Sequence, residues 1–274
     1  MTDCDASLAD AGPVLLLGCG KMGSAMLAGW LARGLPTDAV QVIDPSPSDW
    51  LKARAAEGVR LNSGAPAPAR VAMLAVKPQM MGEAAPGLAS LAGGETLFLS
   101  IAAGTPMAAF EAIYGPETPI IRAMPNTPSA VGRGITAIVG NAAAEEAHLA
   151  LAERLLAALG QTVRLEAEAQ IDAVTGLSGS GPAYVFHLIE AMAAAGEAEG
   201  LAPELAMRLA RATVTGAGAL ADASEESAEQ LRINVTSPGG TTAAGLAVLM
   251  PELTDLMGRT VSAAAARGRE LAKP

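Results

Sequence analysis

Aromatic side chains are scarce in this sequence. They make up 3% of the 274 residues, whereas hydrophobic residues as a class make up 51%. A buried core must therefore be built from Ala, Leu, Val, Ile and Met. At this length the chain can form one large domain or two moderate ones, each with a core of its own.

Cysteines and long apolar runs are also nearly missing. The two cysteines, Cys4 and Cys19, offer no disulfide framework, so we expect a reducing, cytoplasmic location. No run of about 18 apolar residues is free of Gly, Pro and charge, so we expect no membrane span. The stretch from Met1 to Gly12 is acidic and polar, unlike a signal peptide.

Positive charge is in the minority. Lys and Arg number 18 against 28 Asp and Glu, and the formal net charge is -10. Such a surface repels phosphate backbones, so general nucleic-acid binding is not expected. An anionic ligand would have to be bound by local groups, namely backbone N–H groups, helix ends and a few Lys or Arg side chains.

One glycine motif stands out near the beginning of the chain. Val14–Leu17 is an apolar run typical of a buried parallel strand, and Gly18, Gly20 and Gly23 follow it with the spacing G-x-G-x-x-G. In dinucleotide-binding domains the first glycine permits the turn, the second lets a pyrophosphate approach, and the third lets helix and strand pack. The motif predicts a nucleotide site. A turn without a ligand is the alternative, because the chain has 30 glycines.

An acidic residue follows the next predicted strand. Val40–Ile43 ends at Asp44, about 20 residues beyond the last glycine of the motif, where Rossmann domains place an acid on the ribose hydroxyls. That position suggests NAD. However, the serines within Pro45–Ser48 could hold the 2′-phosphate of NADP, and no arginine stands directly after Asp44. The choice between NAD and NADP stays open, as does a simple turn role for Asp44.

The first half of the chain alternates apolar runs with helical segments. This alternation predicts an α/β fold with a Rossmann-type, doubly wound parallel sheet. Further strands are predicted at Val71–Val76, Leu97–Ile101, Pro119–Met124, Ile135–Val139 and Thr162–Leu165. Helices are predicted from about Met22 to Gly34, and at 79–92, 106–113 and 144–159.

Small, polar and proline residues follow the strands of this predicted sheet. In a doubly wound sheet the ligand lies outside the carboxyl ends of the strands. Those ends carry Gly18–Gly23, Asp44, Lys77-Pro78, Ala102–Gly104 and Pro125–Thr127. We therefore expect a single crevice along this edge.

From about residue 166 onward, strands no longer alternate with helices. Ala-rich helices are predicted at 168–175, 181–200, 203–222, 224–235, 241–250 and 252–271. We predict a dinucleotide-binding domain over 1–165 and an all-α domain over 166–274. Because these helices are apolar around much of their circumference, we also predict an intertwined dimer; cover by the Rossmann half is the alternative.

The stretch Ser237-Pro238-Gly239-Gly240-Thr241-Thr242 precedes a predicted helix. Its backbone N–H groups and hydroxyls could bind an anion such as a carboxylate. The alternative is an N-capping turn in which the threonine hydroxyls bond helix N–H groups. These residues alone favour neither interpretation.

Four motifs, in this order along the chain, resemble those of pyrroline-5-carboxylate reductase, the family that makes L-proline in its last biosynthetic step. They are Ala75-Val76-Lys77-Pro78-Gln79, Arg122-Ala123-Met124-Pro125-Asn126-Thr127-Pro128, the run from Thr175 to Tyr184, and the run from Val235 to Thr242. The resemblance extends from about Val14 to Leu271. Its most specific part is Ser-Pro-Gly-Gly-Thr-Thr.

The resemblance implies NADP as the cofactor, with NAD as the alternative. The residues implied to bind it are Gly18, Cys19, Gly20, Lys21, Met22, Gly23, Asp44, Ser46, Asn62, Ala75, Val76, Lys77, Pro78, Ala102, Ala103, Gly104 and Asn234. Many members have Asn where this chain has Lys21, and a lysine adds positive charge near phosphate. The Asp44-Pro45 pair is a second departure from the family's pattern, and it leaves the coenzyme preference open.

The resemblance also implies a substrate site and no metal ion. The carboxylate of pyrroline-5-carboxylate or proline would be held by Ser237, Gly240, Thr241 and Thr242. Glu168 and Glu225 would lie near the substrate, with a solvated helix face as the alternative for each. Thr175 would bond the ring nitrogen as the catalytic residue.

This chemistry fits what the sequence lacks. A cyclic imine becomes electrophilic once protonated, and solvent can protonate it near neutral pH, so no dedicated proton donor is needed. The only histidines, His148 and His187, are interpreted as surface or packing residues. Catalysis would then consist mainly of positioning the nicotinamide and the imine carbon.

Other functions stay open at this point. A related imine reductase is one, and a β-hydroxyacid-type reductase is another. The latter generally needs a lysine acid/base in its helical domain, and Lys273 is the only lysine after residue 77. A non-catalytic dinucleotide-binding protein would not need both loops. We therefore expect an NAD(P)H-dependent reductase that forms a homodimer, assembled further into a larger ring such as a decamer.

Overall fold

The structure is a computed structural model that describes residues 7–272. It divides into two compact units, one formed by Met1–Gly179 with Ala265–Pro274 and the other by Ser180–Ala264. Cys4 and Lys273 lie outside the described residues. The last strand ends at Arg164, just before the domain boundary predicted between 165 and 166, which itself stays a prediction.

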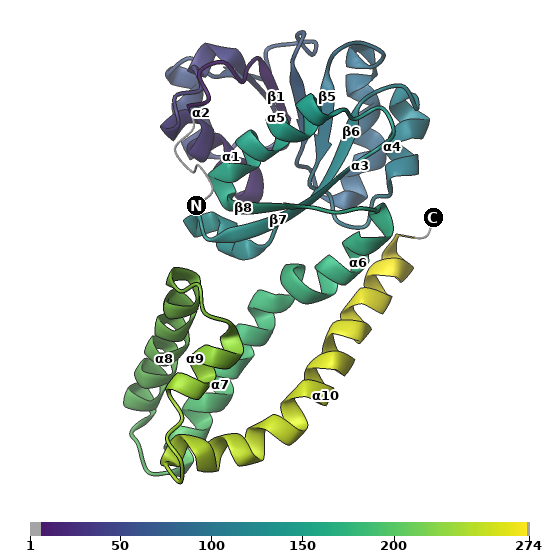
Figure 1. The fold of residues 1–274 in the computed structure, drawn as a ribbon. Coiled ribbons are helices and arrows are strands. Elements are labelled where there is room, and N and C mark those ends of the chain that lie inside the picture. Colours follow the sequence, from purple (N-terminus) through teal and green to yellow (C-terminus); the bar gives the residue numbers. More distant parts are fainter. Residues whose placement is uncertain (1–6, 273–274) are drawn as a thin grey trace. The chain divides into compact units, whose positions relative to one another are not determined.

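The first unit is built on an eight-stranded sheet with the order β3-β2-β1-β4-β5-β6-β7-β8 (Figure 1). The strands are β1 Val14–Leu17, β2 Val40–Ile43, β3 Arg60–Leu61, β4 Val71–Leu74, β5 Leu97–Ser100, β6 Ile120–Met124, β7 Gly134–Gly140 and β8 Gly160–Arg164. The predicted Rossmann-type sheet is confirmed: β1 to β6 are parallel and doubly wound. β7 runs antiparallel to β6, so the sheet is not wholly parallel, and β8 is parallel to β7. The sequence did not predict β3, whose two residues are too few to form a pattern.

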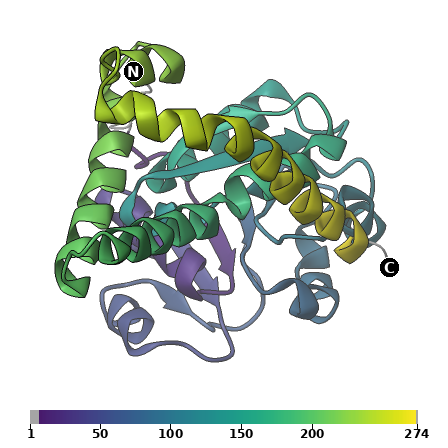
Figure 2. The same cartoon turned by 90° about the horizontal axis from the view of Figure 1, so that it is seen from below.

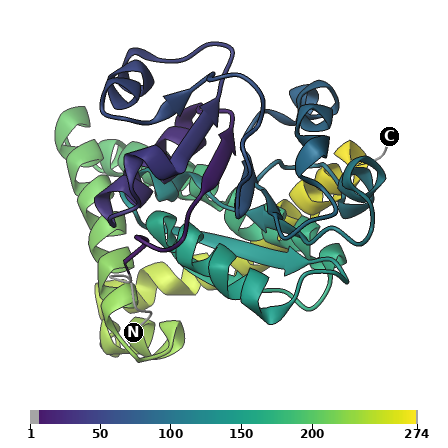
Figure 3. The same ribbon diagram turned by 90° about the horizontal axis from the view of Figure 1, so that it is seen from above.

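Alternate residues of β1 face opposite sides of the sheet. Val14 and Leu16 belong to one hydrophobic cluster, and Leu15 and Leu17 belong to another. The first cluster includes residues of α1 (Lys21–Ala32) and α5 (Glu146–Leu156), and the second includes residues of α3 (Pro78–Ala84) and α4 (Met107–Tyr114). Helices thus cover both faces (Figures 1 and 3), which explains why β1 is apolar throughout. A further helix, α2 (Asp49–Ala56), follows β2.

The few aromatic residues anchor these layers. Trp30 on α1 is fully buried, and its indole Nε1 donates to the Leu155 carbonyl of α5 at 2.8 Å. On the other face Tyr114 stacks on Phe98, with ring centroids 3.9 Å apart, and its hydroxyl donates to the Ala85 carbonyl. Burial raises the pKa of the Tyr114 hydroxyl, which stays protonated as a donor.

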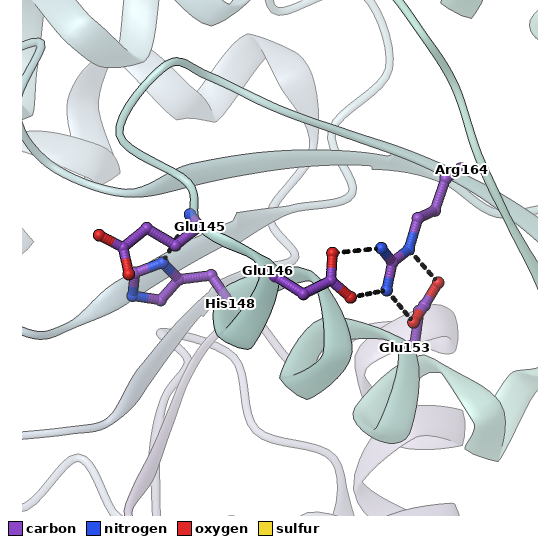
Figure 4. A network of polar contacts seen from close by, with 5 residues as sticks. All are labelled: Glu145, Glu146, His148, Glu153 and Arg164. Carbon is purple, nitrogen blue, oxygen red and sulfur yellow. Dashed lines mark hydrogen bonds and ion pairs between the residues drawn. The ribbon is translucent and has the colours of Figure 1, made fainter.

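The strand β8 is tied to α5 at the surface by one arginine. Arg164 contacts Glu146 and Glu153 with paired hydrogen bonds of 2.7 and 2.8 Å to each carboxylate (Figure 4). At the start of the same helix, Nδ1 of His148 accepts a hydrogen bond from the Glu145 N–H at 3.0 Å. These contacts fix the end of the sheet without using its core.

Helices make up the rest of the chain. They are α6 Ile171–Val174, α7 Gly181–Ala198, α8 Pro203–Ala223, α9 Ala228–Asn234 and α10 Thr241–Leu271. In the second unit α7 and α8 pack together (Figures 1 and 2). The side chains buried there are small, among them Ala193, Ala206 and Ala210. The abundance of alanine makes this close approach possible.

Four helix predictions in the second half of the chain were wrong in detail. The helices predicted at 241–250 and 252–271 form one helix, α10, with Pro251 inside it, although proline removes one backbone donor there. The helix predicted over 224–235 begins only at Ala228, where the Ser227 side chain accepts from Gln230 N and caps it. The segment predicted as helix over 168–175 is a 3-10 turn, the short α6, and then a π-helical turn at Thr175–Gly179.

None of the helices within residues 7–272 has the length and apolar character needed to cross a lipid bilayer.

Candidate functional site

Several loops leave the sheet at the same level on its carboxyl edge. Gly18 N donates to the Ile43 carbonyl and Ala75 N donates to the Leu17 carbonyl, each at 2.8 Å. These bonds continue the ladder of β2, β1 and β4 by one residue, so the loops after β1 and β4 start side by side. The predicted cofactor residues of the first unit all follow strands at this edge, namely Gly18–Gly23, Asp44, Ser46, Asn62, Ala75–Pro78 and Ala102–Gly104.

Gly18 and Gly23 are required by the packing of the loop itself. Gly18 has a φ of 89°, and a Cβ there would lie 2.8 Å from Cγ1 of Val76. A Cβ on Gly23 would overlap the Gly18 carbonyl oxygen. These two glycines therefore allow α1 to start directly after β1.

Gly20 has no such packing reason. No heavy atom lies within 4 Å of the place where its Cβ would be, and its φ of -69° suits any residue. The space stands at the start of α1, where free N–H groups and the helix dipole favour an anion. Exposed Lys21 begins the helix, and the first turn of α1 holds no acidic residue. The loop thus fits the pyrophosphate of a dinucleotide.

The carboxylate of Asp44 is turned toward the glycine loop. Its Oδ2 accepts from Cys19 N at 2.6 Å, and its Oδ1 accepts from Ser46 N at 2.8 Å. Asn62 holds the Asp44 backbone from the other side, because it accepts from Asp44 N at 2.9 Å and donates to Asp44 O at 2.7 Å. Ser46 and Asn62 are themselves exposed at this edge of the sheet.

Cys19 is part of the glycine loop, and its side chain packs into the core of the first unit. Its side chain is buried, and its Sγ is 3.5 Å from Oγ of Ser24, which also donates to the Cys19 carbonyl at 2.9 Å. Burial is the main cause that raises the pKa of this thiol, and the Asp44 charge adds to it. Cys19 therefore stays a neutral thiol at neutral pH.

A cavity of about 450 Å³ lies beside the loops that follow β4 and β5. Thr175 lines this cavity together with Pro78 and Ala103-Gly104, which belong to the loops predicted to flank the nicotinamide. The full lining is Pro78, Gln79, Ala103, Gly104, Thr105, Ile171, Asp172, Thr175, Gly268 and Leu271.

The hydroxyl of Thr175 has a defined direction. Its Oγ1 donates to the Ile171 carbonyl, four residues earlier, at 2.8 Å. The hydroxyl proton is therefore used inside the helix, and the oxygen lone pairs remain to accept a hydrogen bond. Thr175 suits a ligand N–H group and does not suit the delivery of a proton.

Glu168 is engaged within the first unit. Its Oε1 forms an ion pair with Arg122 and also accepts from Met107 N, at the start of α4, at 2.6 Å. The Arg122 side chain is 9% exposed and that of Glu168 is 36% exposed. Glu168 thus joins β6 to α4, a contact that the sequence did not predict. Its role at the substrate stays a prediction.

The second unit holds the predicted carboxylate loop. Gly240 N donates to the Ser237 carbonyl at 3.1 Å and Ala244 N donates to the Gly240 carbonyl at 3.2 Å, so a turn leads into α10 at Thr241. The first N–H groups of a helix lack partners within it, which provides the donors that an anion site requires. Nearby in the chain, Asn234 at the end of α9 donates to Glu226 at 2.9 Å.

The remaining candidate side chains are at the surface. Glu225 is exposed and lies in the loop between α8 and α9, so it is not on a helix face. The His187 side chain is 81% exposed and lies 3.0 Å from Glu190, while His148 contacts the start of α5 (Figure 4). Within residues 7–272 no group of three or more His, Cys, Asp or Glu could hold a metal ion.

One motif that the sequence singled out contains no predicted site residue, although part of it was expected to line the carboxyl edge. It is the run from Arg122 to Pro128, which crosses from β6 into the next loop. In the structure Arg122 pairs with Glu168, and the Asn126 side chain donates to the Ser178 carbonyl at 3.2 Å. The sequence could point to these residues only through the motif, because Glu168 and Ser178 are distant from Arg122 and Asn126 in the chain.

Two family models match the chain. Residues 168–271 match the model described as pyrroline-5-carboxylate reductase dimerisation, and residues 13–104 match the one described as NADP oxidoreductase, coenzyme F420-dependent. Together they cover the glycine loop, the loops after β4 and β5, and the carboxylate loop.

Similar proteins are known in full length. The chain is 40% identical to a pyrroline-5-carboxylate reductase of Pseudomonas aeruginosa over 264 residues. The aligned residues are 95% of this chain and 97% of the relative. It is 35% identical to that of Pisum sativum over 271 residues, 96% of this chain and 97% of the relative.

Solved structures of similar proteins share the fold. A pyrroline-5-carboxylate reductase from Coxiella burnetii matches with a TM-score of 0.90 and 34% identity, over 97% of this chain and 100% of that one. A Plasmodium falciparum pyrroline carboxylate reductase with NADP bound matches with a TM-score of 0.77 and 26% identity, over 95% and 98% of the two chains.

Proposed function

Because this chain belongs to the pyrroline-5-carboxylate reductase family, we propose that it reduces 1-pyrroline-5-carboxylate to L-proline with a hydride from NADPH. The protein is an oxidoreductase, and its cofactor is a nicotinamide dinucleotide. The observation that carries the assignment of the site is the carboxyl edge of the sheet, where the open space at Gly20 and the cavity beside Thr175 belong to one unit.

The glycine loop binds the coenzyme through its backbone. The N–H groups at the start of α1 face the pyrophosphate, and Gly20 leaves the room for its approach. When bound, the reduced nicotinamide supplies the hydride. The loops Ala75–Pro78 and Ala102–Gly104 flank the nicotinamide half.

Thr175 orients the substrate ring. The ring nitrogen of the protonated imine is a donor, and Oγ1 of Thr175 is an acceptor because its own proton is bonded to Ile171 O. This contact favours the charged, electrophilic form of the imine without moving a proton. Solvent supplies the proton, and the protein contributes position.

The Ser237–Thr242 loop selects the substrate by its carboxylate. The hydroxyls of Ser237, Thr241 and Thr242 and the first N–H groups of α10 act as donors to it. Gly240 keeps the loop tight, since an added Cβ would overlap Oγ of Ser237. Glu168 and Glu225 stay assigned to the vicinity of the substrate, and Asn234 stays assigned to the coenzyme.

NADP is the coenzyme that the adenosine end favours. Both carboxylate oxygens of Asp44 already accept backbone N–H groups, so its usual contact with the ribose hydroxyls has competitors within the protein. Ser46 and Asn62 are exposed next to it and have the hydrogen-bond donors that a 2′-phosphate needs.

The protein associates with itself, and we assign it a homodimer that assembles further into a ring such as a decamer. Large apolar side chains are exposed on the helices of the second unit, among them Phe186 at 60% and Val248 at 72%. Such surfaces mark protein interfaces. The cytoplasm is the proposed location.

Turnover is the first test. Purified protein mixed with 1-pyrroline-5-carboxylate and NADPH should oxidise the coenzyme and form L-proline, followed by the loss of nicotinamide absorbance and by amino-acid analysis. NADH serves as the comparison. If neither coenzyme is oxidised, the reductase assignment is wrong.

Thr242→Val tests the carboxylate loop. Removing one hydroxyl that bonds a charged group costs about 1.5–3 kcal/mol, so KM for the substrate should rise at least about tenfold while KM for NADPH barely changes. Thr260→Val is the matched control, because the Thr260 hydroxyl on the same helix only bonds the Leu256 carbonyl at 2.8 Å. Equal effects of the two variants would mean that the loop is only structural.

A further inference from the structure

We propose that Asn126 is a positioning residue for this reaction. Its side-chain amide holds the π-helical turn Thr175–Gly179, and with it the Thr175 hydroxyl, against the carboxyl end of β6. The inference rests on the proposed function, because it concerns the placement of the residue that orients the substrate ring.

The amide of Asn126 is engaged at both ends. Its Oδ1 accepts from Ile135 N at 3.0 Å, and its Nδ2 donates to the Ser178 carbonyl at 3.2 Å. Ile135 belongs to β7, so the sheet fixes one end of the amide while the other end reaches the turn. Asn126 cannot rotate about its side chain without losing one of these bonds.

The Ser178 carbonyl has a particular need for this donor. In a π-helical turn a carbonyl bonds the N–H five residues later, but Ala183 N donates to the Ser180 carbonyl at 3.0 Å instead. The α-helical partner, four residues later, would be Pro182, which has no N–H. The chain therefore cannot supply the ordinary helical partner. Asn126 supplies a donor from outside the helix.

Alternate residues of β6 and its extension contact the same segment. Arg122 pairs with Glu168, and a Cβ on Gly179 would lie 2.8 Å from Cε of Met124. Asn126 is the next residue in this alternation, and its backbone is extended with a φ of -125°. Side chains two apart on a strand point to one face, so the motif from Arg122 to Asn126 presents one row of contacts to residues 168–179.

The π-helical turn that Asn126 holds contains Thr175, the residue assigned to the substrate ring. Thr175 is its first residue, and its hydroxyl bonds the Ile171 carbonyl, while the Ser178 hydroxyl bonds the Val174 carbonyl at 3.1 Å. π-Helical turns are rare and occur often at functional sites. A small displacement of this turn moves the acceptor away from the ring nitrogen, and a misplacement of about 1 Å can cost about a hundredfold in rate.

Asn126→Ala is the principal variant. Its kcat should fall about tenfold to a hundredfold while the Kd for NADPH, which the glycine loop sets, stays unchanged. Asn126→Asp is the second variant, because it keeps the acceptor for Ile135 N and replaces the donor to Ser178 with a carboxylate oxygen, which repels that carbonyl. It should show the same loss in kcat even if the alanine variant folds poorly.

Asn141→Ala is the matched control. Asn141 bridges the other end of β6 in a similar manner, since it accepts from Ile120 N at 3.1 Å and donates to the Thr118 carbonyl at 3.0 Å. It also donates to Glu111 Oε1 at 3.2 Å. The two alanine variants should lose similar thermal stability, and only the one at position 126 should lose kcat. If both keep the wild-type kcat, or both lose it equally, Asn126 has no positioning role.

The double variant Asn126→Ala/Pro182→Ala tests the reason given for the contact. Alanine at position 182 restores the N–H that an α-helix would offer to the Ser178 carbonyl, so part of the lost kcat should return. If the double variant is no faster than Asn126→Ala, the role assigned to the Ser178 carbonyl is wrong. Failure of the proposed function would look different, because the wild-type protein itself would then not turn over the imine.

Discussion

The carboxylate of Asp44 accepts a hydrogen bond of 2.6 Å from the backbone N–H of Cys19, which joins the end of β2 to the glycine loop after β1. The other oxygen of the same carboxylate holds Ser46 N. An acid at this position is expected on the ribose. In this protein it fixes the shape of two loops that we assign to the coenzyme.

Asp44→Asn should therefore lower the stability of the protein and weaken the binding of NADPH and NADH to a similar extent. One backbone N–H loses its charged acceptor, which costs about 1.5–3 kcal/mol in the free energy of unfolding. The Kd values for NADPH and NADH should rise by similar factors, because the glycine loop is assigned to the pyrophosphate that they share. Urea unfolding and fluorescence titration measure the two effects. A selective loss of NADH binding would instead assign Asp44 to the ribose.

Ser46→Ala should discriminate between the coenzymes. The exposed Ser46 hydroxyl is assigned to the 2′-phosphate, so the Kd for NADPH should rise about tenfold while that for NADH stays the same. Ser48→Ala is the control, since the Ser48 hydroxyl caps α2 by accepting from Leu51 N at 3.2 Å. That variant should lose about 1 kcal/mol of stability and no coenzyme affinity.

Gly20→Ala and Gly23→Ala should separate binding from folding. A Cβ at position 20 meets nothing in the protein, so the variant should keep its Tm while the added methyl group blocks the pyrophosphate and raises the Kd for NADPH at least tenfold, or about 1.4 kcal/mol. A Cβ at position 23 meets the Gly18 carbonyl, so the main effect of Gly23→Ala should be a lower Tm. Thermal melts with and without NADPH test both. An unchanged Kd in Gly20→Ala would place the pyrophosphate elsewhere.

The parts of the fold that the sequence predicts are those determined by residues close together in the chain. Val14–Leu17 is apolar because both of its faces are buried, and the spacing of Gly18, Gly20 and Gly23 follows from one turn and one helix start. Strand pairing and the carboxyl-edge crevice follow from the alternation of strands and helices. Pro251 was misleading for the same reason: its local preference predicts a break, but α10 continues through it.

The contacts within the site have causes that are distant in the chain. Asp44 lies 25 residues from Cys19, and Asn126 lies 52 residues from Ser178. Residue types at these positions allow many partners, and only the folded sheet selects one. The sequence could therefore name Asp44 and the motif around Asn126 without showing what either contacts.

Arg164→Gln should reduce stability in a way that depends on pH. Hydrogen bonds to Arg164 hold the pKa of Glu146 below its ordinary value of 4.5 (Figure 4). A lowered pKa in the folded state stabilises the protein above the ordinary value, and this contribution is lost as the pH falls through the folded pKa. The difference in Tm between wild type and variant should thus be largest at neutral pH and shrink below pH 4.5. Added salt should also shrink it, because these side chains are partly exposed. A difference that is constant with pH would contradict the ion-pair explanation.

The Cys19 thiol should react slowly in the folded protein. In a Cys4→Ser background, Cys19 is the only thiol, and its alkylation by iodoacetamide at neutral pH can be followed by intact mass. Burial raises its pKa, so the reactive thiolate is scarce until urea unfolds the chain. The Asp44 charge raises the same pKa, so Asp44→Asn in this background should speed alkylation of the folded protein. Alkylation as fast as that of the unfolded chain would show that the thiol is accessible. If alkylation is no faster in Asp44→Asn than in the Cys4→Ser protein, the Asp44 charge does not raise the pKa of Cys19.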